Sequence, residues 1–396
     1  MEKKKITFNL NEDDHMKVVI LGGDGFCGWP TSLRLAAAGH EVLIIDNLSR
    51  RRIDNELSSG SLTNISSIHE RVKTANELIG KIGFKLIDVA KDYELLKAAF
   101  DDFRPDAVVQ FAEQRAAPYS MIGDSERRYT VDNNITGTHN VCSAIVEVDP
   151  SIHLVHLGTM GVYGYSKAFG SIPEGYLDIT INSTGSSTDI LYPANPGSVY
   201  HMTKCLDQLI FQFYNKNWGL KITDLHQGIV WGVETEETAM APNLVNRFDY
   251  DGIYGTVLNR FISQAANDVP LTVYGTGGQS RAFIHISDTA TCVRLAIENS
   301  DFDVSKVRIF NQVSEVHSVL GLANILKKNY SATIDLKDNP RKELAENELE
   351  VANTGLVSLG FKPILLSESL IDDVRFIAEA TRTKFNRDNV MSSPKW

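Results

Sequence analysis

Residues 17–28 read KVVILGGDGFCG, and this stretch decides the fold class. The run KVVIL is continuous and apolar, which is typical of a central strand in a parallel sheet. Gly22, Gly25 and Gly28 then follow at intervals of three residues, and a helical pattern begins near Phe26. Glycine at these positions allows a tight turn, a close approach of backbone to pyrophosphate, and close packing of helix on strand. The stretch therefore predicts a strand–turn–helix unit that binds a dinucleotide.

An aspartate at the end of the next apolar run indicates which dinucleotide is bound. The run Glu41–Ile45 is followed by Asp46, which stands 18 residues after Gly28. A carboxylate at this point can accept both ribose hydroxyls and repels a 2′-phosphate, so NAD is favoured over NADP. The run SRRR at 49–52 leaves the NADP alternative open, because arginines sometimes hold a 2′-phosphate. If the glycines made only a turn, Asp46 would instead cap a helix.

The alternation of strands and helices continues to about residue 235. Four further apolar runs have the length and composition of buried strands: Phe84–Ile87, Ala107–Phe111, His153–Leu157 and Lys221–Leu225. Such alternation predicts an α/β fold with a doubly wound parallel sheet, the Rossmann architecture. We expect a flexible leader over 1–15, an NAD-binding domain over 16–235, and a smaller C-terminal substrate-binding domain over 236–396 with some segments returning to the first domain.

The bulk composition is that of an ordinary globular protein. Of the 396 residues, 43% are hydrophobic and 22% are charged, and the net charge is -11. This acidic balance argues against a nucleic-acid partner. No apolar run approaches the roughly 18 residues that span a membrane, and the first residues lack the pattern of a signal or transit peptide. The four cysteines are scattered without zinc-site spacing. We expect a cytoplasmic protein without a bound metal.

A tyrosine and a lysine four residues apart carry the predicted chemistry. The segment YHMTK places Tyr200 and Lys204 on one face of a helix, and Thr159 follows the strand HLVHL. The ammonium of Lys204 should stabilise a phenolate and lower the pKa of Tyr200. Tyr200 would then take the proton of a sugar hydroxyl while NAD accepts hydride from the same carbon. Thr159 would orient the substrate. Taken alone, the pair is common on protein surfaces, and it gains meaning from the dinucleotide signature.

Together these motifs resemble the extended short-chain dehydrogenase/reductase family, the nucleotide-sugar epimerases and dehydratases. The similarity runs from about Met16 to about Asp288 and includes LTVYGTGGQSR at 271–281. The resemblance implies that Gln279 and Arg281 line the diphosphate of a nucleotide sugar, and a guanidinium has the fork geometry for that role. Related enzymes pair through two helices per subunit, so a homodimer is expected by analogy.

Longer segments are similar to the family of UDP-sulfoquinovose synthases, over nearly the whole chain. These segments are GGDGFCGWP (22–30), DNLSRR (46–51), FAEQRAAPYSM (111–121), LGTMGVYG (157–164), YHMTK (200–204), LHQGIVWGV (225–233), NRFDYD (246–251) and NPRKE (339–343). The resemblance implies that UDP-glucose and sulfite, or a sulfite donor, are converted to UDP-sulfoquinovose with bound NAD. C4 of the glucose would be oxidised, water lost across C5–C6, sulfite added at C6, and the hydride returned to C4.

The sequence departs from the sugar dehydratases beside the strand-end threonine. Those enzymes carry Thr-Asp-Glu where this chain has Thr159-Met160-Gly161, so the usual carboxylate acid/base pair is absent. We hypothesise that His201, next to Tyr200, takes the C5 proton, because imidazole titrates near neutral pH. Neighbouring helix residues point about a quarter-turn apart, so a structural role for His201 is the alternative.

Gln114 and Arg115 directly follow the strand that ends at residue 111. This position is the carboxyl edge of the sheet, where ligands of doubly wound folds bind. We predict that Arg115 contacts the sugar or the incoming sulfite, because a guanidinium suits such an anion. The alternative is a structural ion pair of Arg115 with Glu113.

The complete prediction extends these motifs along the chain. The expected catalytic residues are Thr159, Tyr200, His201 and Lys204. The expected NAD contacts are Gly22, Gly25, Phe26, Cys27, Gly28, Asp46, Asn47, Arg50, Asp88, Val89, Asn134, Tyr200, Lys204, Gln227 and Val230. The expected substrate contacts are Gln114, Arg115, Thr159, Tyr200, Gln227, Thr256, Arg260, Thr272, Val273, Tyr274, Gln279, Arg281 and Arg341. Two other functions stay open: a UDP-sugar 4-epimerase or 4,6-dehydratase that never uses sulfite, and a non-catalytic NAD-binding scaffold.

Overall fold

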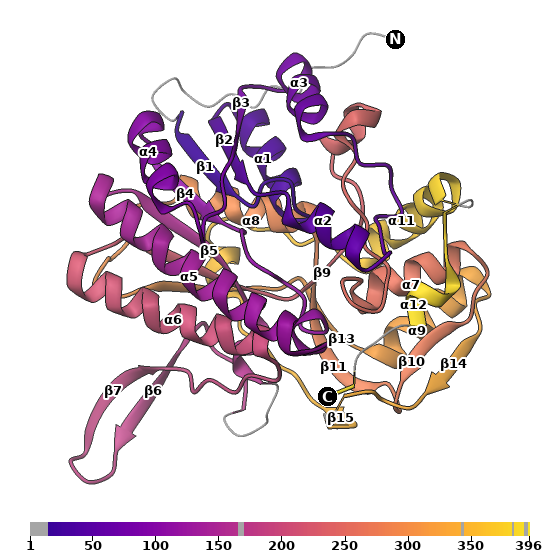
Figure 1. Ribbon diagram of the computed structural model, residues 1–396. Coiled ribbons are helices and arrows are strands. Elements are labelled where there is room, and N and C mark those ends of the chain that lie inside the picture. Colours follow the sequence, from indigo (N-terminus) through magenta and orange to yellow (C-terminus); the bar gives the residue numbers. More distant parts are fainter. Residues whose placement is uncertain (1–14, 165–169, 342–343, 382–383, 392–394) are drawn as a thin grey trace.

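The computed structural model describes residues 15–164, 170–341, 344–381, 384–391 and 395–396. The predicted parallel sheet is confirmed: its seven strands follow the order β12-β8-β5-β4-β1-β2-β3, and each neighbouring pair is parallel (Figure 1). Their bounds are β1 Lys17–Leu21, β2 Glu41–Asp46, β3 Ile82–Leu86, β4 Ala107–Gln110, β5 His153–Thr159, β8 Ile222–Gln227 and β12 Arg308–Gln312. The expected leader, 1–15, lies outside the described residues except for His15.

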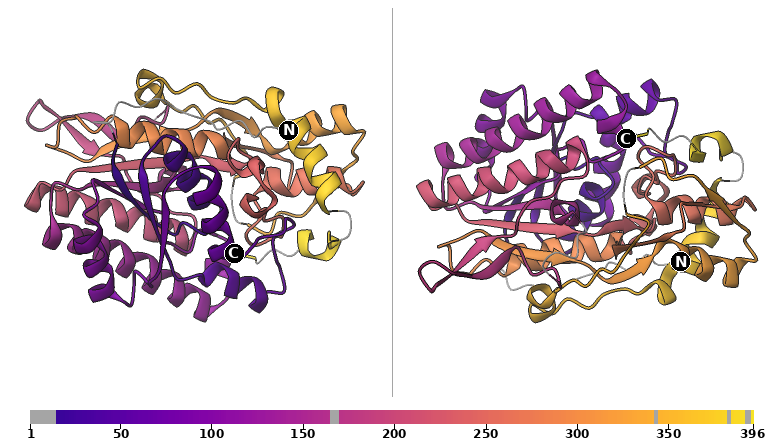
Figure 2. Two further views of the ribbon diagram at one scale, coloured as in Figure 1. Left: turned by 90° about the horizontal axis from the view of Figure 1, so that it is seen from above. Right: turned by 90° about the horizontal axis from the view of Figure 1, so that it is seen from below.

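Helices cover both faces of this sheet, as Figure 2 shows from two sides. One face carries α4 Tyr93–Phe103, α5 Asp124–Val148 and α6 Val199–Trp218, and the other carries α1 Gly28–Ala37 and α8 Ile286–Glu298. In β1, Val18 and Ile20 belong to the core beside α1, whereas Val19 and Leu21 belong to the core beside α5. Successive side chains of a strand point to opposite faces, so a strand covered on both faces must be apolar throughout.

A second group of elements packs around a hydrophobic core of its own. Its strands are β9 Ile229–Trp231, β10 Leu271–Tyr274, β11 Gly278–His285, β13 Glu315–Ser318, β14 Ile334–Lys337 and β15 Glu346–Asn347. Its helices are α7 Val257–Ala266, α9 Val319–Tyr330, α11 Leu366–Thr381 and α12 Arg387–Met391. Between these elements the chain returns to the parallel sheet: α8 covers one of its faces and β12 extends it at one edge.

The remaining elements are short. They are α2 Ser49–Glu56, α3 Ile68–Leu78, α10 Thr354–Ser358, and the hairpin of β6 Tyr176–Ile181 and β7 Ser186–Leu191, which projects from the body of the molecule (Figures 1 and 2). Among the described residues, no helix combines the length and the apolar composition that crossing a membrane requires.

The six predicted strands end within two residues of the observed ones, but β12, the β6–β7 hairpin and the strands of the second group were not predicted. Strand β12 reads RIFNQ, and its polar end does not look like part of a buried sheet. In the structure the amide of Asn311 donates to the carbonyl oxygens of Pro173 and Ala352, and that of Gln312 donates to Thr289. Long-range hydrogen bonds thus satisfy polar groups that the sequence alone would place at the surface.

Candidate active site

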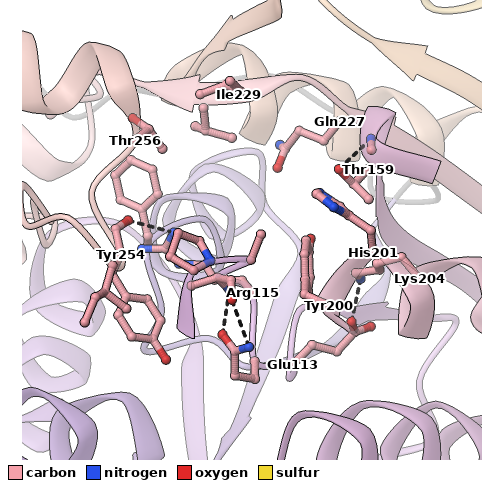
Figure 3. Close-up of a pocket in the computed structure, with 18 of the residues that line it drawn as sticks. Glu113, Arg115, Thr159, Tyr200, His201, Lys204, Gln227, Ile229, Tyr254 and Thr256 are labelled. Atoms are coloured by element: carbon pink, nitrogen blue, oxygen red, sulfur yellow. Dashed lines mark hydrogen bonds and ion pairs between the residues drawn. The ribbon is translucent and has the colours of Figure 1, made fainter. Parts of the chain in front are cut away.

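The carboxyl ends of the parallel strands open into a cavity of about 910 Å³. Loops that follow β1, β2, β4, β5 and β8 line it on the side of the parallel sheet, and residues of α7, β10 and β11 line it on the side of the second group of elements. Figure 3 shows the side chains that face each other across this space. Doubly wound sheets bind their ligands at this edge, and the volume is in the range of cofactor and substrate sites.

The turn after β1 is built so that backbone can approach a ligand closely. Gly22 has φ +79°, in the left-handed region that favours glycine. A Cβ on Gly28 would lie 2.2 Å from the carbonyl oxygen of Gly22 and 2.8 Å from Cα of Gly23. Helix α1 begins at Gly28, which lines the cavity, and helix N-termini bind phosphate groups. These residues therefore fit the pyrophosphate of a dinucleotide.

We expect Gly28→Ala to lose bound NAD, because the added methyl group would push the backbone of the turn apart. Overpacking of this kind also lowers the free energy of unfolding by about 1–3 kcal/mol. Gly60→Ala is the control, since a Cβ there meets no atom within 4 Å. The NAD released by denaturing each purified protein measures the effect. Wild-type NAD content in Gly28→Ala would contradict the placement of pyrophosphate at this turn.

Asp46 ends β2 at the wall of the cavity, and the backbone holds its carboxylate there. One oxygen accepts the N–H of Asp24 at 2.9 Å, and the other accepts the N–H of Leu48 at 2.7 Å. Burial raises the pKa of Asp46 to about 6. Because each carboxylate oxygen has two lone pairs, both can still accept a hydrogen bond from a ribose hydroxyl.

Arginines 50 to 52, which made NADP binding an alternative in the sequence, form ion pairs with carboxylates of the protein. The pairs are Arg50–Asp249 at 3.1 Å, Arg51–Asp24 at 2.6 Å and Arg52–Glu56 at 3.3 Å. The guanidinium of Arg50 also lies 3.6 Å from the ring centre of Tyr254. Since these cations already have anionic partners, and since Asp46 adds a carboxylate to the site, the arrangement favours NAD over NADP.

Helix α6 places Tyr200 and Lys204 on the cavity wall, one turn apart (Figure 3). The ammonium of Lys204 donates to the carbonyl oxygen of Leu157 at 2.7 Å and pairs with the carboxylate of Glu113 at 2.6 Å. Burial raises the pKa of Tyr200 to about 12, and the opposing influence of Lys204 is smaller. Lys204 therefore lowers the pKa of Tyr200, as predicted, but burial outweighs this effect and the pKa lies above its ordinary value. The charge of Lys204 is already compensated by Glu113.

Glu113 is a site residue that the sequence reasoning missed. The alternative prediction for Arg115, an ion pair with Glu113, is wrong. Arg115 pairs instead with Asp249 and donates to the carbonyl oxygen of Tyr254. Glu113 stands directly before Gln114 at the end of β4, and this position was the available signal. Nothing local in the sequence indicates that Lys204, 91 residues further on, would be its partner.

Thr159 and His201 lie together beside Tyr200 (Figure 3). The rings of Tyr200 and His201 have centres 5.2 Å apart, and Nδ1 of His201 is 3.1 Å from the hydroxyl of Ser198. Gly161 makes room for the imidazole, since a Cβ there would lie 2.2 Å from His201 Cδ2. Burial, with the nearby charges of arginines 341 and 281, lowers the pKa of His201 to about 4, so the ring is neutral at pH 7.

Most of the other predicted residues line the same cavity. These are Phe26, Cys27, Asn47, Arg50, Val89, Gln114, Arg115, Gln227, Val230, Thr256, Arg260, Thr272, Tyr274, Gln279, Arg281 and Arg341. Three predicted residues do not line it: Asp88, Asn134 and Val273. Val273 alternates with its neighbours in β10 and points into the second core, while Asn134 binds the main chain of Gln114. The carboxylate of Asp88 accepts from Asn47 and from the N–H of Ala90.

Comparisons with known proteins agree with this site. Residues 18–311 match the model of the NAD dependent epimerase/dehydratase family. The chain is 45% identical to a chloroplastic UDP-sulfoquinovose synthase of Spinacia oleracea, over 98% of this chain and 80% of the relative. It is 39% identical to a UDP-sulfoquinovose synthase of Sulfolobus acidocaldarius, over 96% of this chain and 98% of the relative.

Solved structures share the fold at lower identity. A UDP-glucose 4-epimerase of Thermotoga maritima superposes with a TM-score of 0.67 at 20% identity, over 94% of this chain and all of that chain. A UDP-glucuronic acid 4-epimerase of Bacillus cereus, in complex with NAD, gives a TM-score of 0.66 at 20% identity, over 93% of this chain and all of that chain. By sequence and by fold, the chain belongs to the NAD-dependent epimerase/dehydratase family and, within it, to the UDP-sulfoquinovose synthases.

Proposed function

We propose that the protein converts UDP-glucose and sulfite to UDP-sulfoquinovose and uses NAD without net consumption. The observation that carries this proposal is the identity of 45% and 39%, over nearly the whole chain, to two enzymes of that name. The cavity supports it, because it brings Thr159, Tyr200, His201 and Lys204 to one wall and glycines of the dinucleotide turn to another. Bound NAD supplies an acceptor for the C4 hydride and later returns it.

Tyr200 and Lys204 act on the C4 hydroxyl in this proposal. The phenol oxygen takes the hydroxyl proton as the C4 ketone forms, and Lys204, one turn along α6, holds positive charge beside it. Thr159 offers a neutral hydroxyl from the end of β5 to orient the sugar. With C4 oxidised, the proton on the neighbouring C5 becomes acidic, and this permits loss of water across C5–C6. Sulfite then adds at the exposed C6.

His201 is the proposed base for the C5 proton. Its imidazole is neutral at pH 7 and lines the cavity beside Tyr200, so a nitrogen lone pair is available to accept a proton. Its hydrogen bond with Ser198, the N-cap residue of α6, fixes the ring next to Gly161. The quarter-turn between neighbouring helix residues does not carry His201 away from the cavity.

Arg115 is the proposed contact for sulfite. Its guanidinium lines the cavity and lies 5.4 Å from the ring centre of Tyr254 and 5.5 Å from that of Phe26. Asp249 and the carbonyl oxygen of Tyr254 each take one of the five N–H donors of the guanidinium, and the others are available to an anion. Sulfite carries oxygens that accept such hydrogen bonds while its sulfur attacks carbon.

A direct test is to incubate the purified protein with UDP-glucose and sulfite and to analyse the product by mass spectrometry. A UDP-sugar that has gained one sulfonate group and lost one oxygen is the expected product. Without sulfite, absorbance at the NADH maximum and an unsaturated 4-keto sugar nucleotide are expected. UDP-galactose as the main product would support a 4-epimerase instead, which is the function of some solved structures with this fold. If no NADH forms, the alternative function of a non-catalytic NAD-binding scaffold would be supported instead.

His201→Ala is expected to keep NADH formation from UDP-glucose but to slow formation of the unsaturated sugar by about 10²–10⁴-fold, since a positioned base contributes that much. Rapid-quench analysis of the sugar nucleotides separates the two steps. His317→Ala is the matched control, because His317 pairs with Glu315 in the second domain and does not line the cavity. Dehydration at the wild-type rate in His201→Ala would assign His201 a structural role.

We also propose a homodimer that pairs α5 and α6 with the same helices of a second copy. These two helices pack side by side, and α6 exposes Leu209 (58%), Phe213 (55%) and Trp218 (46%). Such residues on one helix are typical of an interface. Phe213→Lys should therefore halve the mass measured by light scattering, and an unchanged mass would argue against this surface.

The four cysteines are free and buried, which fits a reducing compartment such as the cytoplasm.

A further inference from the structure

A cluster of charged side chains extends from the cavity wall, at Lys204 and Glu113, into the interior of the protein. Its members are Lys204 from α6, Glu113 after β4, His156 in β5 and Asp224 in β8, and their side chains are at most 4% exposed. The ring of His156 donates from Nδ1 to Asp224 at 2.8 Å and from Nε2 to Glu113 at 2.9 Å. Nζ of Lys204 lies 3.0 Å from His156 Nε2 and 2.6 Å from Glu113.

One further carboxyl group belongs to this cluster and is poorly satisfied. Asp207 follows Lys204 by one turn of α6 and is fully buried. Neither of its oxygens makes a well-formed hydrogen bond among the described residues, and the nearest ring nitrogen, Nε2 of His156, is 3.6 Å away. Burial and the charge of Glu113 raise the pKa of Asp207 to about 7. Asp207 can therefore gain or lose a proton in the physiological range.

Glu113, His156 and Asp207 could together hold a metal ion by their spacing. The ammonium of Lys204, however, already bonds Glu113 and lies against His156. Lys204 and the protonated His156 therefore supply the positive charge of this cluster. Several side chains face Asp207 from the elements packed against it. The charged ones are Glu113, His156 and Lys204, and the others are Tyr200, Thr138, Cys142 and Cys205.

The reaction needs a proton acceptor that Tyr200 alone does not provide. With its pKa at about 12, Tyr200 is a phenol at neutral pH and already carries a proton. Burial would raise the pKa of Glu113, but Lys204 and His156 outweigh it and lower that pKa. Burial and Lys204 lower the pKa of His156, but the two carboxylates outweigh them and raise it to about 9. Of these groups, Asp207 is the one whose proton affinity suits a reversible acceptor.

We propose that Asp207 stores the proton that leaves the C4 hydroxyl and returns it when C4 is reduced. His156 passes its Nε2 proton to Asp207, and the same nitrogen then accepts from Lys204, at 3.0 Å. Lys204 then takes the proton of the Tyr200 hydroxyl, and Tyr200 takes the proton of the C4 hydroxyl of the sugar. The C4 O–H and C–H bonds break, two electrons leave with the hydride, and one proton ends on Asp207. His156, Lys204 and Tyr200 end with the same number of protons as they had at the start. This inference rests on the proposed function.

The test counts protons during the half-reaction. UDP-glucose is added without sulfite to the NAD-loaded protein in weak buffer that contains a pH-indicator dye, and NADH absorbance is recorded at the same time. At about pH 8, where Asp207 starts ionised, we expect close to zero protons released in step with NADH; the stored proton should leave afterwards, because a group with a pKa of about 7 does not keep a proton at pH 8 at equilibrium. At about pH 6, where Asp207 is already protonated, we expect about one proton released in step with NADH. The dye change that UDP-glucose causes in Tyr200→Phe is subtracted, because that variant reports binding alone.

Asp207→Asn keeps the shape of the side chain but cannot store a proton, so about one proton per NADH should appear at both pH values. Asp373→Asn is the matched control: Asp373 is a buried aspartate of α11 that accepts the N–H of Val233 and does not line the cavity. It should behave as the wild type does. Release of about one proton in step with NADH by the wild type at about pH 8 would overturn the inference even if Asp207→Asn does not fold. Absence of NADH would overturn the proposed function instead.

Discussion

Tyr200→Phe is expected to slow NADH formation from UDP-glucose by about 10²–10⁴-fold, because it removes the group that exchanges a proton with the C4 hydroxyl. Tyr200 is 9% exposed, and its oxygen is the only atom that phenylalanine lacks, so packing in α6 should be preserved. Binding of UDP-glucose should therefore stay close to the wild type. Stopped-flow absorbance of the NAD-loaded protein measures the rate, and isothermal titration measures the binding.

Tyr176→Phe is the matched control for this change. Its hydroxyl donates to the carbonyl oxygen of Val307 and accepts from Gln212, at the root of the β6–β7 hairpin. Tyr176 does not line the cavity, so NADH formation should be unaffected. If Tyr200→Phe forms NADH at the wild-type rate, another group exchanges the C4 proton, and both the proposed mechanism and the proton store at Asp207 would have to be abandoned.

The dinucleotide half of the site could be predicted because its signals are local. A strand, a glycine turn and a helix follow one another within residues 17–37, and Asp46 ends the very next strand. Each of these features has a steric or electrostatic reason that needs no distant partner. The same holds for the spacing of Tyr200 and Lys204, which a single helix fixes.

The charged cluster could not be predicted because its contacts cross the sheet. Glu113 follows β4, whereas His156 lies within β5 and Asp224 within β8, and these residues meet only when the three strands pair in register. Register also decides which residue of a strand faces a ligand. In β10 a shift of one residue exchanges Thr272 and Tyr274 for Val273, and the sequence does not indicate which set faces the cavity.

The net shift in the pKa of Tyr200 was not predicted for the same reason. The effect of Lys204 on Tyr200 depends on what else compensates the ammonium, and that partner, Glu113, lies on a different strand. A charge that is already paired stabilises a neighbouring phenolate less, while burial acts fully against ionisation. Spacing along a helix therefore predicts which groups are neighbours but not the proton affinity that results.

Lys204→Met tests this buried pairing most severely. Removing the ammonium leaves the carboxylate of Glu113, 3% exposed, with His156 as its main partner. Loss of one member of a buried ion pair lowers the free energy of unfolding by about 3–5 kcal/mol, because the remaining charge stays out of water. The midpoint of chemical denaturation should fall accordingly, and NADH formation should fall with it. Lys85→Met, which breaks an exposed pair with Asp102, should change the free energy of unfolding by less than about 1 kcal/mol.

The double variant Lys204→Met with Glu113→Gln separates stability from chemistry. Once both charges are gone, no carboxylate of the pair is left uncompensated, so much of the lost stability should return. NADH formation should not return, because the ammonium that holds positive charge beside Tyr200 is still missing. If Lys204→Met is as stable as the wild type, then Glu113 must find another partner or take up a proton, and the ion pair is not what holds Lys204 in place. If instead the double variant recovers activity as well, Lys204 serves the fold rather than the reaction.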